Sequence, residues 1–461
     1  MTTTIKRSAS LFVATLLGAA TGGLFGFASL ASAAEPEPAP APAPAAVTPP
    51  APVQTAQAEP ANQPGTDADS QSEMTFGHGR AAAPSPTTTT GAPPPPPAEA
   101  PPVRQRPRTM EEVAGASVQE LTFRSARWRY SLNFFGDVSM SGGKPSEGEH
   151  AFGFGLGGQD ILIRGELSEN IVTTTEMAFE AGEDGGIGVD LERFNVRWQS
   201  SRYFVEAGRT HTSFGYWNNA YHHGRWLQPT IERPRWVAFE DDGGILPVHW
   251  VGAGAGLRAP LGDATVNLNG TVGNGRGKIV DDVRNNHDYQ NMKSFHGSLE
   301  VVGIGRPELR MGVAGIYGRI PAQPDRLSLP NVEFTEVIGS AHIAYVNVPL
   351  LFIAEGYDVA HLALGHQWTT YGGFILLGYA VGRVTPYVEV ERIANKGGQD
   401  PFFIPDPAAT GLPTFDSLEG IVGLRLDLTD WTALKVEYRQ TKMWDLHLTQ
   451  YDGILNWSWG F

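Results

Sequence analysis

Apolar and polar residues alternate along most of the chain from residue 128 to residue 461. Near the carboxyl end, Leu434, Val436 and Tyr438 alternate with Lys435, Glu437 and Arg439. A period of two places such sets on opposite faces of a β-strand. Similar segments recur between clusters of Gly, Pro, Asn and Asp, and no convincing helical stripe interrupts them. The pattern predicts an all-β body.

The same alternation assigns residues to the two faces of predicted strands elsewhere in residues 128–461. Within residues 190–199, one face is predicted to carry Leu191, Arg193, Asn195, Arg197 and Gln199, and the other Phe194, Val196 and Trp198. Periodicity alone does not say which face is inside. A soluble sandwich turns its apolar face toward a dry core, whereas a wide membrane barrel turns its polar face toward water.

The last residues of the chain favour the barrel. Leu455, Trp457, Trp459 and Phe461 share one face, and Asn456, Ser458 and Gly460 occupy the other. Soluble domains avoid such a contiguous aromatic patch, whereas lipid accommodates it.

The amino-terminal residues predict export. Residues 1–33 read as a signal peptide, with Lys6 and Arg7 before an apolar stretch and small residues at 31–33. Apart from that stretch, no apolar run is long enough for a membrane helix, so closed strands are the expected way to span a bilayer. The chain contains no cysteine, which excludes disulfides, a lipid-modified cysteine and thiol chemistry.

A compositional break separates the signal from the body. Residues 34–108 hold more than half of the 35 prolines, together with much alanine and threonine. This composition predicts a disordered spacer. It is either an inert spacer or a tether to peptidoglycan or a periplasmic protein. Residues 109–127 are expected to form a short linker or helix.

These features together resemble the outer-membrane β-barrel porins of Gram-negative bacteria. The resemblance implies that Leu455, Trp457, Trp459 and Phe461 are the assembly signal read by the barrel insertion machinery. Residues 128–461 are then an antiparallel transmembrane barrel of about 16 strands, with 14 and 18 as alternatives. The aromatic residues expected at its interfaces include Trp198, Tyr203, Trp368, Tyr371, Tyr387 and Trp431.

In one segment, residues 210–247, the alternation of apolar and polar residues stops, and charged and aromatic residues are frequent. Long connections of this kind are usually functional. Residues 203–224 resemble the region of porins in which a strand ending in Gly-Arg leads to a loop that narrows the pore. By that resemblance the candidates for the constriction are Arg209, His211, His222, His223, Arg225, Arg233, Arg235, Glu240, Asp241 and Asp242.

Two interpretations of these charges remain open. In a narrow throat of low dielectric constant, the arginines would attract anions and the carboxylates cations. Alternatively, the charges pair with one another and pin the loop.

Other chemistry is not expected. His211, His222 and His223 with the acids at 240–242 include metal-ligand types, but adjacent histidines on a strand point apart, and neither a metal nor a cofactor is predicted. No nucleophile motif accompanies them, so we expect no enzyme. The net charge of −15 disfavours nucleic acid.

The sequence therefore predicts a channel that passes small hydrophilic solutes or ions by passive diffusion across the bacterial outer membrane. The alternative is a plugged barrel that serves as a structural anchor, with its proline-rich arm contacting the cell envelope. We expect outer-membrane lipid to surround the barrel. Many porins form homotrimers, but no interface can be read in this sequence.

Overall fold

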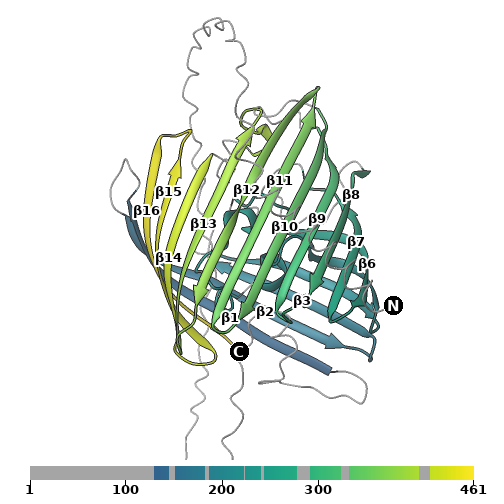
Figure 1. The fold of residues 1–461 in the computed structure, drawn as a ribbon, viewed down its shortest axis with the longest axis horizontal. Helices are drawn as coiled ribbons and strands as arrows, with labels where there is room; N and C mark the ends of the chain where they lie inside the picture. Colours follow the sequence, from purple (N-terminus) through teal and green to yellow (C-terminus); the bar gives the residue numbers. More distant parts are fainter. Residues whose placement is uncertain are drawn as a thin grey trace, which may run out of the picture. The chain divides into compact units, whose positions relative to one another are not determined.

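The computed structural model describes residues 129–144, 151–181, 186–222, 224–239, 243–277, 291–322, 332–403 and 416–461. These residues form sixteen antiparallel strands that close into a barrel (Figure 1). The predicted signal peptide, spacer and linker lie outside the described residues. Within the described part of the chain, no helix is both long and apolar enough to cross a membrane.

The strands follow the chain in order around the barrel. Their bounds are β1 (Arg129–Lys144), β2 (Ala151–Glu166), β3 (Ile171–Ala181), β4 (Ile187–Gln199), β5 (Tyr203–His211), β6 (His249–Leu261), β7 (Ala264–Asn274), β8 (Lys293–Val302), β9 (Leu309–Ile320), β10 (Phe334–Asn347), β11 (Leu350–Ala363), β12 (His366–Tyr379), β13 (Val384–Lys396), β14 (Ser417–Asp427), β15 (Thr432–Met443) and β16 (Leu448–Gly460).

The first and last strands close the barrel. β1 pairs with β16 in a register that places Val138 opposite Trp457. Beyond the end of β16, Phe134 and Phe461 exchange two backbone hydrogen bonds of 2.8 and 3.0 Å. Every strand thus has two neighbours and the sheet has no open edge, which is the condition for a sheet that crosses a bilayer. The predicted all-β barrel of about 16 strands is confirmed.

The two faces of the wall are chemically different. On β15, Lys435 and Glu437 are buried, whereas Val436 and Tyr438 are about half-exposed. On β16, Asn456 is fully buried and Trp457 is half-exposed. The apolar face therefore lies outside, where it requires hydrocarbon, and the polar face lies inside. The faces predicted for these two strands are confirmed.

β4 departs from simple alternation. The register between β3 and β4 shifts after the pair Glu176–Arg193, which leaves Glu192 as an extra, buried residue. Leu191 and Phe194 are both exposed, on the same outer face. The prediction that placed Leu191 beside Arg193 was wrong, because a β-bulge changes the phase of every residue beyond it.

The predicted aromatic belt is also only partly correct. Trp198 and Tyr203 are about half-exposed on the outer surface near strand ends. Tyr387, in contrast, is buried, and its hydroxyl donates a 2.7 Å hydrogen bond to Glu437 on the inner face. Tyr387 therefore belongs to the polar interior, since its phenol has a buried carboxylate to bond.

Candidate functional site: an inward-folded loop

Residues 212–248, here called the inner loop, connect β5 to β6. They contain a short helix, α3 (Trp217–Ala220), and one turn of 3-10 helix, η2 (Arg235–Val237). Trp217 is fully buried, and its ring meets that of Phe374 on β12 at a centroid distance of 5.9 Å. Since β12 lies on the other side of the ring of strands from β5 and β6, the loop crosses the interior of the barrel.

Glutamates of the wall hold the backbone of the inner loop. Each lies buried and accepts a hydrogen bond from N–H groups of the loop. The bonds join Glu355 to Tyr216 (2.9 Å) and Trp217 (2.7 Å), Glu437 to Ile231 (2.6 Å), and Glu391 to Arg235 (2.7 Å). These bonds provide acceptors for backbone N–H groups that would otherwise be buried without one.

Basic groups of the wall bind the carbonyl oxygens of the same loop. The guanidinium of Arg425 on β14 donates to the carbonyls of Trp226 (2.6 Å) and Gln228 (2.8 Å). The side-chain nitrogen of Lys435 on β15 donates to the carbonyl of Thr230 at 2.7 Å. The wall thus satisfies buried donors and acceptors of an irregular segment, which would otherwise be costly.

Two glycines allow the close approach of the inner loop to the wall. Gly224 has φ +76°, and a Cβ there would lie 2.9 Å from the ring of Phe135. Gly215 has φ +56°, and a Cβ there would lie 1.8 Å from an oxygen of Glu355. Any other residue at either position would be strained and would push the loop off the wall.

The candidate arginines are bound to specific partners. Arg225 donates to Asp137 on β1 at 3.1 Å. Arg233 stays within the loop, where it donates to the carbonyl of Val237 at 2.5 Å and lies over the ring of Phe239 at 4.4 Å. These contacts tie Arg225 to the wall and Arg233 to the backbone of the loop.

Arg235 lies near wall carboxylates. Burial lowers the pKa of its guanidinium, and the negative charges of Glu391 and Glu419 oppose that shift. Arginine remains protonated in proteins, so this side chain keeps its charge. Arg209 lies on β5 and donates from Nε to the carbonyl of Glu192 at 3.2 Å. The predicted candidates His223, Glu240, Asp241 and Asp242 lie outside the described residues.

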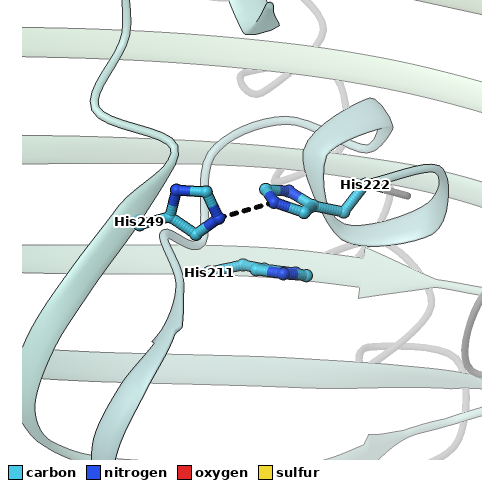
Figure 2. Close-up of side chains that lie close together, drawn as sticks. All are labelled: His211, His222 and His249. Atoms are coloured by element: carbon cyan, nitrogen blue, oxygen red, sulfur yellow. Dashed lines mark hydrogen bonds between the residues drawn. The ribbon is translucent and has the colours of Figure 1, made fainter. Parts of the chain in front are cut away.

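The root of the inner loop brings three histidines together. His211 ends β5, His249 begins β6, and His222 comes from the loop between them (Figure 2). Their ligating nitrogens all lie within 4.8 Å of one another. Glu192, the extra residue of the β4 bulge, lies 2.6 Å from Nε2 of His249. His249 and Glu192 were not among the predicted site residues.

His249 and Glu192 were missed in the sequence for the same physical reason. His249 is far from the histidines of 211–223 in sequence, and only the pairing of His211 with His249 across β5 and β6 brings it near. Glu192 reaches the cluster only because of the bulge. Strand pairing and bulges depend on contacts between distant segments, so local patterns do not reveal them.

No family model and no curated protein matches this chain. Among solved structures, it is similar to the anion-selective porin from Comamonas acidovorans, with a TM-score of 0.52 and 11% identity over 72% of this chain and 100% of that one. OmpF of Salmonella typhi gives a TM-score of 0.49 at 10% identity, over 74% of this chain and 100% of that one. DcaP of Acinetobacter baumannii gives a TM-score of 0.48 at 10% identity, over 74% and 99%. The likeness to the Comamonas protein shows the fold, and the predicted resemblance to outer-membrane porins is confirmed at that level.

Proposed function

We propose that the barrel is an outer-membrane porin-type channel, through which small hydrophilic solutes or ions diffuse passively. The observation that carries this proposal is the inner loop, which crosses a closed sixteen-stranded barrel whose inner wall is charged. Barrels of this strand number are wide enough for an aqueous channel. A loop folded inward narrows such a channel without interrupting the wall.

The charges at the loop suit a role in selectivity. Arg225 keeps about a third of its side chain exposed while it contacts Asp137, and Glu232 keeps about half exposed while it contacts Arg439. Charges that are fixed by one partner and still reach water set the local potential. We infer that solute size is limited by the loop and that ion preference follows these exposed charges.

A second candidate function is a plugged barrel that anchors the cell envelope. It is supported by the depth to which the inner loop is buried, including Trp217, Trp226 and Trp236 with no exposed surface. In that case the proline-rich arm of residues 34–108 contacts peptidoglycan or a periplasmic protein. A homotrimer is compatible with either function, and chemical crosslinking of intact membranes tests it.

Planar-bilayer recordings distinguish the two functions. The full chain is compared with a variant in which residues 216–237 are replaced by a short Gly-Ser linker, and both are checked for heat-modifiable migration on gels. A channel gives conductance steps with the full chain and larger steps with the variant. A plugged barrel is silent until the loop is replaced. If both folded proteins are silent, the channel proposal is wrong.

Uptake into liposomes tests the solute class. Vesicles that contain the full chain should swell in small sugars, and swelling should become slower as the sugar becomes larger. Replacement of residues 216–237 should weaken that dependence on size, because the proposed limit lies in the loop.

A further inference from the structure

Three histidines at the root of the inner loop have potential ligand atoms within 4.8 Å of one another, and the carboxylate of Glu192 lies beside His249. We propose that His222, His249 and Glu192, completed by His211, bind a divalent transition-metal cation, for which zinc is the best match. This site goes beyond the proposed channel and does not depend on it. It joins β4, β5 and β6 to the inner loop through a single ion.

Three ligand atoms already surround a common point. Nε2 of His249 lies 2.7 Å from Nε2 of His222 and 2.6 Å from Oε2 of Glu192. The remaining pair, Nε2 of His222 and Oε2 of Glu192, is 3.9 Å apart. Figure 2 shows His222 and His249 directed at each other. Histidine nitrogens and a carboxylate oxygen are the ligand types that zinc takes in proteins.

The hydrogen bonds of His222 fix its tautomer. Nδ1 of His222 lies 2.9 Å from Oδ1 of Asn218, and the amide nitrogen of Asn218 is used as a donor toward the carbonyl of Thr212 at 3.0 Å. Oδ1 is therefore the acceptor and Nδ1 of His222 carries the proton. With the proton on Nδ1, Nε2 is the nitrogen of His222 that can direct a lone pair toward His249 and bind a metal.

Hydrogen bonds alone do not account well for the close approach of His222, His249 and Glu192. Nε2 of His249 faces the lone pair of His222 on one side and the carboxylate of Glu192 on the other, and it carries at most one hydrogen. One hydrogen would have to serve two acceptors, both at short distance. A cation among the three atoms attracts all of them at once and removes this competition.

A tetrahedral zinc site requires each of the three separations between ligand atoms to change by about 0.6–0.7 Å. Zinc bonds to histidine nitrogens at about 2.0–2.1 Å, so ligands of a tetrahedral site lie roughly 3.3 Å apart. The observed separations lie on either side of that value. The ring of His211 stacks on that of His222 at a centroid distance of 3.4 Å, with its ligating nitrogen within 4.8 Å of the other two, so His211 has to rotate before it completes the site.

The surroundings support the ligands. Asn218 holds the distal nitrogen of His222, and the ring of Phe239 lies parallel to that of His249 at 6.0 Å. His222 is fully buried, and His249 and Glu192 are almost so. Outer contacts of this kind orient metal-binding histidines and exclude water from the site.

Zinc titration of the folded, detergent-solubilised full chain tests the site. After treatment with a chelator, calorimetry with zinc chloride should show one zinc per chain at this site. His249→Ala should weaken binding by more than about 100-fold, since loss of an outer contact alone costs about 10–100-fold. His366→Ala is the matched control, because His366 is exposed and bonded to Gly397 outside the cluster. It should leave zinc affinity unchanged.

A conservative variant guards against misfolding. Glu192→Gln keeps the size of the side chain and should weaken zinc binding by about 10-fold or more, with unchanged heat-modifiable migration. X-ray absorption of the zinc-loaded protein should show nitrogen and oxygen ligands with the scattering of imidazole rings. The proposal is overturned if the full chain binds no zinc, or if folded His249→Ala and Glu192→Gln bind it as the full chain does. A barrel that binds zinc but does not conduct refutes only the channel.

Discussion

The side-chain nitrogen of Lys435 lies 2.7 Å from the carbonyl oxygen of Thr230. Lys435 belongs to β15, whereas Thr230 belongs to the loop that leaves the wall at β5. Both residues are fully buried. A side chain on one side of the barrel thus holds the backbone of a segment that begins on the other side.

Lys435→Met should release this part of the inner loop. The substitution preserves much of the length of the side chain and removes the donor, which leaves buried carbonyl oxygens without that hydrogen bond. A buried polar group that loses its partner costs about 1–3 kcal/mol. We expect a loss of this size in urea-induced unfolding and noisier open-channel current. Lys442→Met, on the exposed end of the same strand, should change neither. Equal effects of the two variants would contradict the assigned role of Lys435.

A substitution of Glu355 gives a similar test of how the wall holds α3. Its carboxylate accepts the N–H groups of Tyr216 and Trp217, at the start of the short helix. Glu355→Leu should leave these donors unsatisfied, and hydrogen exchange of residues 214–222 should become at least about tenfold faster, the equivalent of about 1.4 kcal/mol. Asp358→Leu on the same strand is the control, because Asp358 is exposed. Unchanged exchange in Glu355→Leu would show that packing alone holds the helix.

The sequence was sufficient for the two faces of β15 and β16, but not for the bulged strand β4 or for the interior. Alternation in β15 identified Lys435, Glu437 and Arg439 as one face, since each strand carries its own period of two. The partners of the inner loop were not predictable. The loop's Thr230 and Ile231 meet Lys435 and Glu437 some 200 residues later in the chain, and only barrel closure brings these segments together.

The outer face provides a test of membrane position. Val436 is about half-exposed at the middle of β15. Val436→Arg should reduce stability in liposomes by about 2–4 kcal/mol, because it places a charge in hydrocarbon. Gln440→Arg lies on the same face closer to the strand end, where the expected loss is about 0–1 kcal/mol. Unfolding by urea from lipid vesicles measures both. Losses below about 1 kcal/mol at both positions would mean that the outer face does not contact hydrocarbon.

The ion pair of Arg225 with Asp137 gives a prediction for ion selectivity, under the proposed channel function. Arg225→Ser removes a partly exposed positive charge and leaves the carboxylate of Asp137. The zero-current potential in a salt gradient should therefore shift toward cation preference, and the shift should shrink at high salt. Asp137→Asn should shift it in the opposite direction. Arg202→Ser, in the exposed turn before β5, should have little effect.

Phe461 takes part in barrel closure and is also one residue of the predicted assembly signal. Its backbone is bonded to that of Phe134, and the two rings lie 5.5 Å apart, whereas the side chain is half-exposed. Because Phe461→Ala preserves the backbone bonds, the folded barrel should keep nearly all its stability. If the insertion machinery reads the aromatic terminus, the amount of barrel in the membrane should fall severalfold in cells. Tyr451→Ala, an exposed aromatic position earlier in β16, is the control. Equal amounts of the two variants in the membrane would argue that Phe461 serves closure alone.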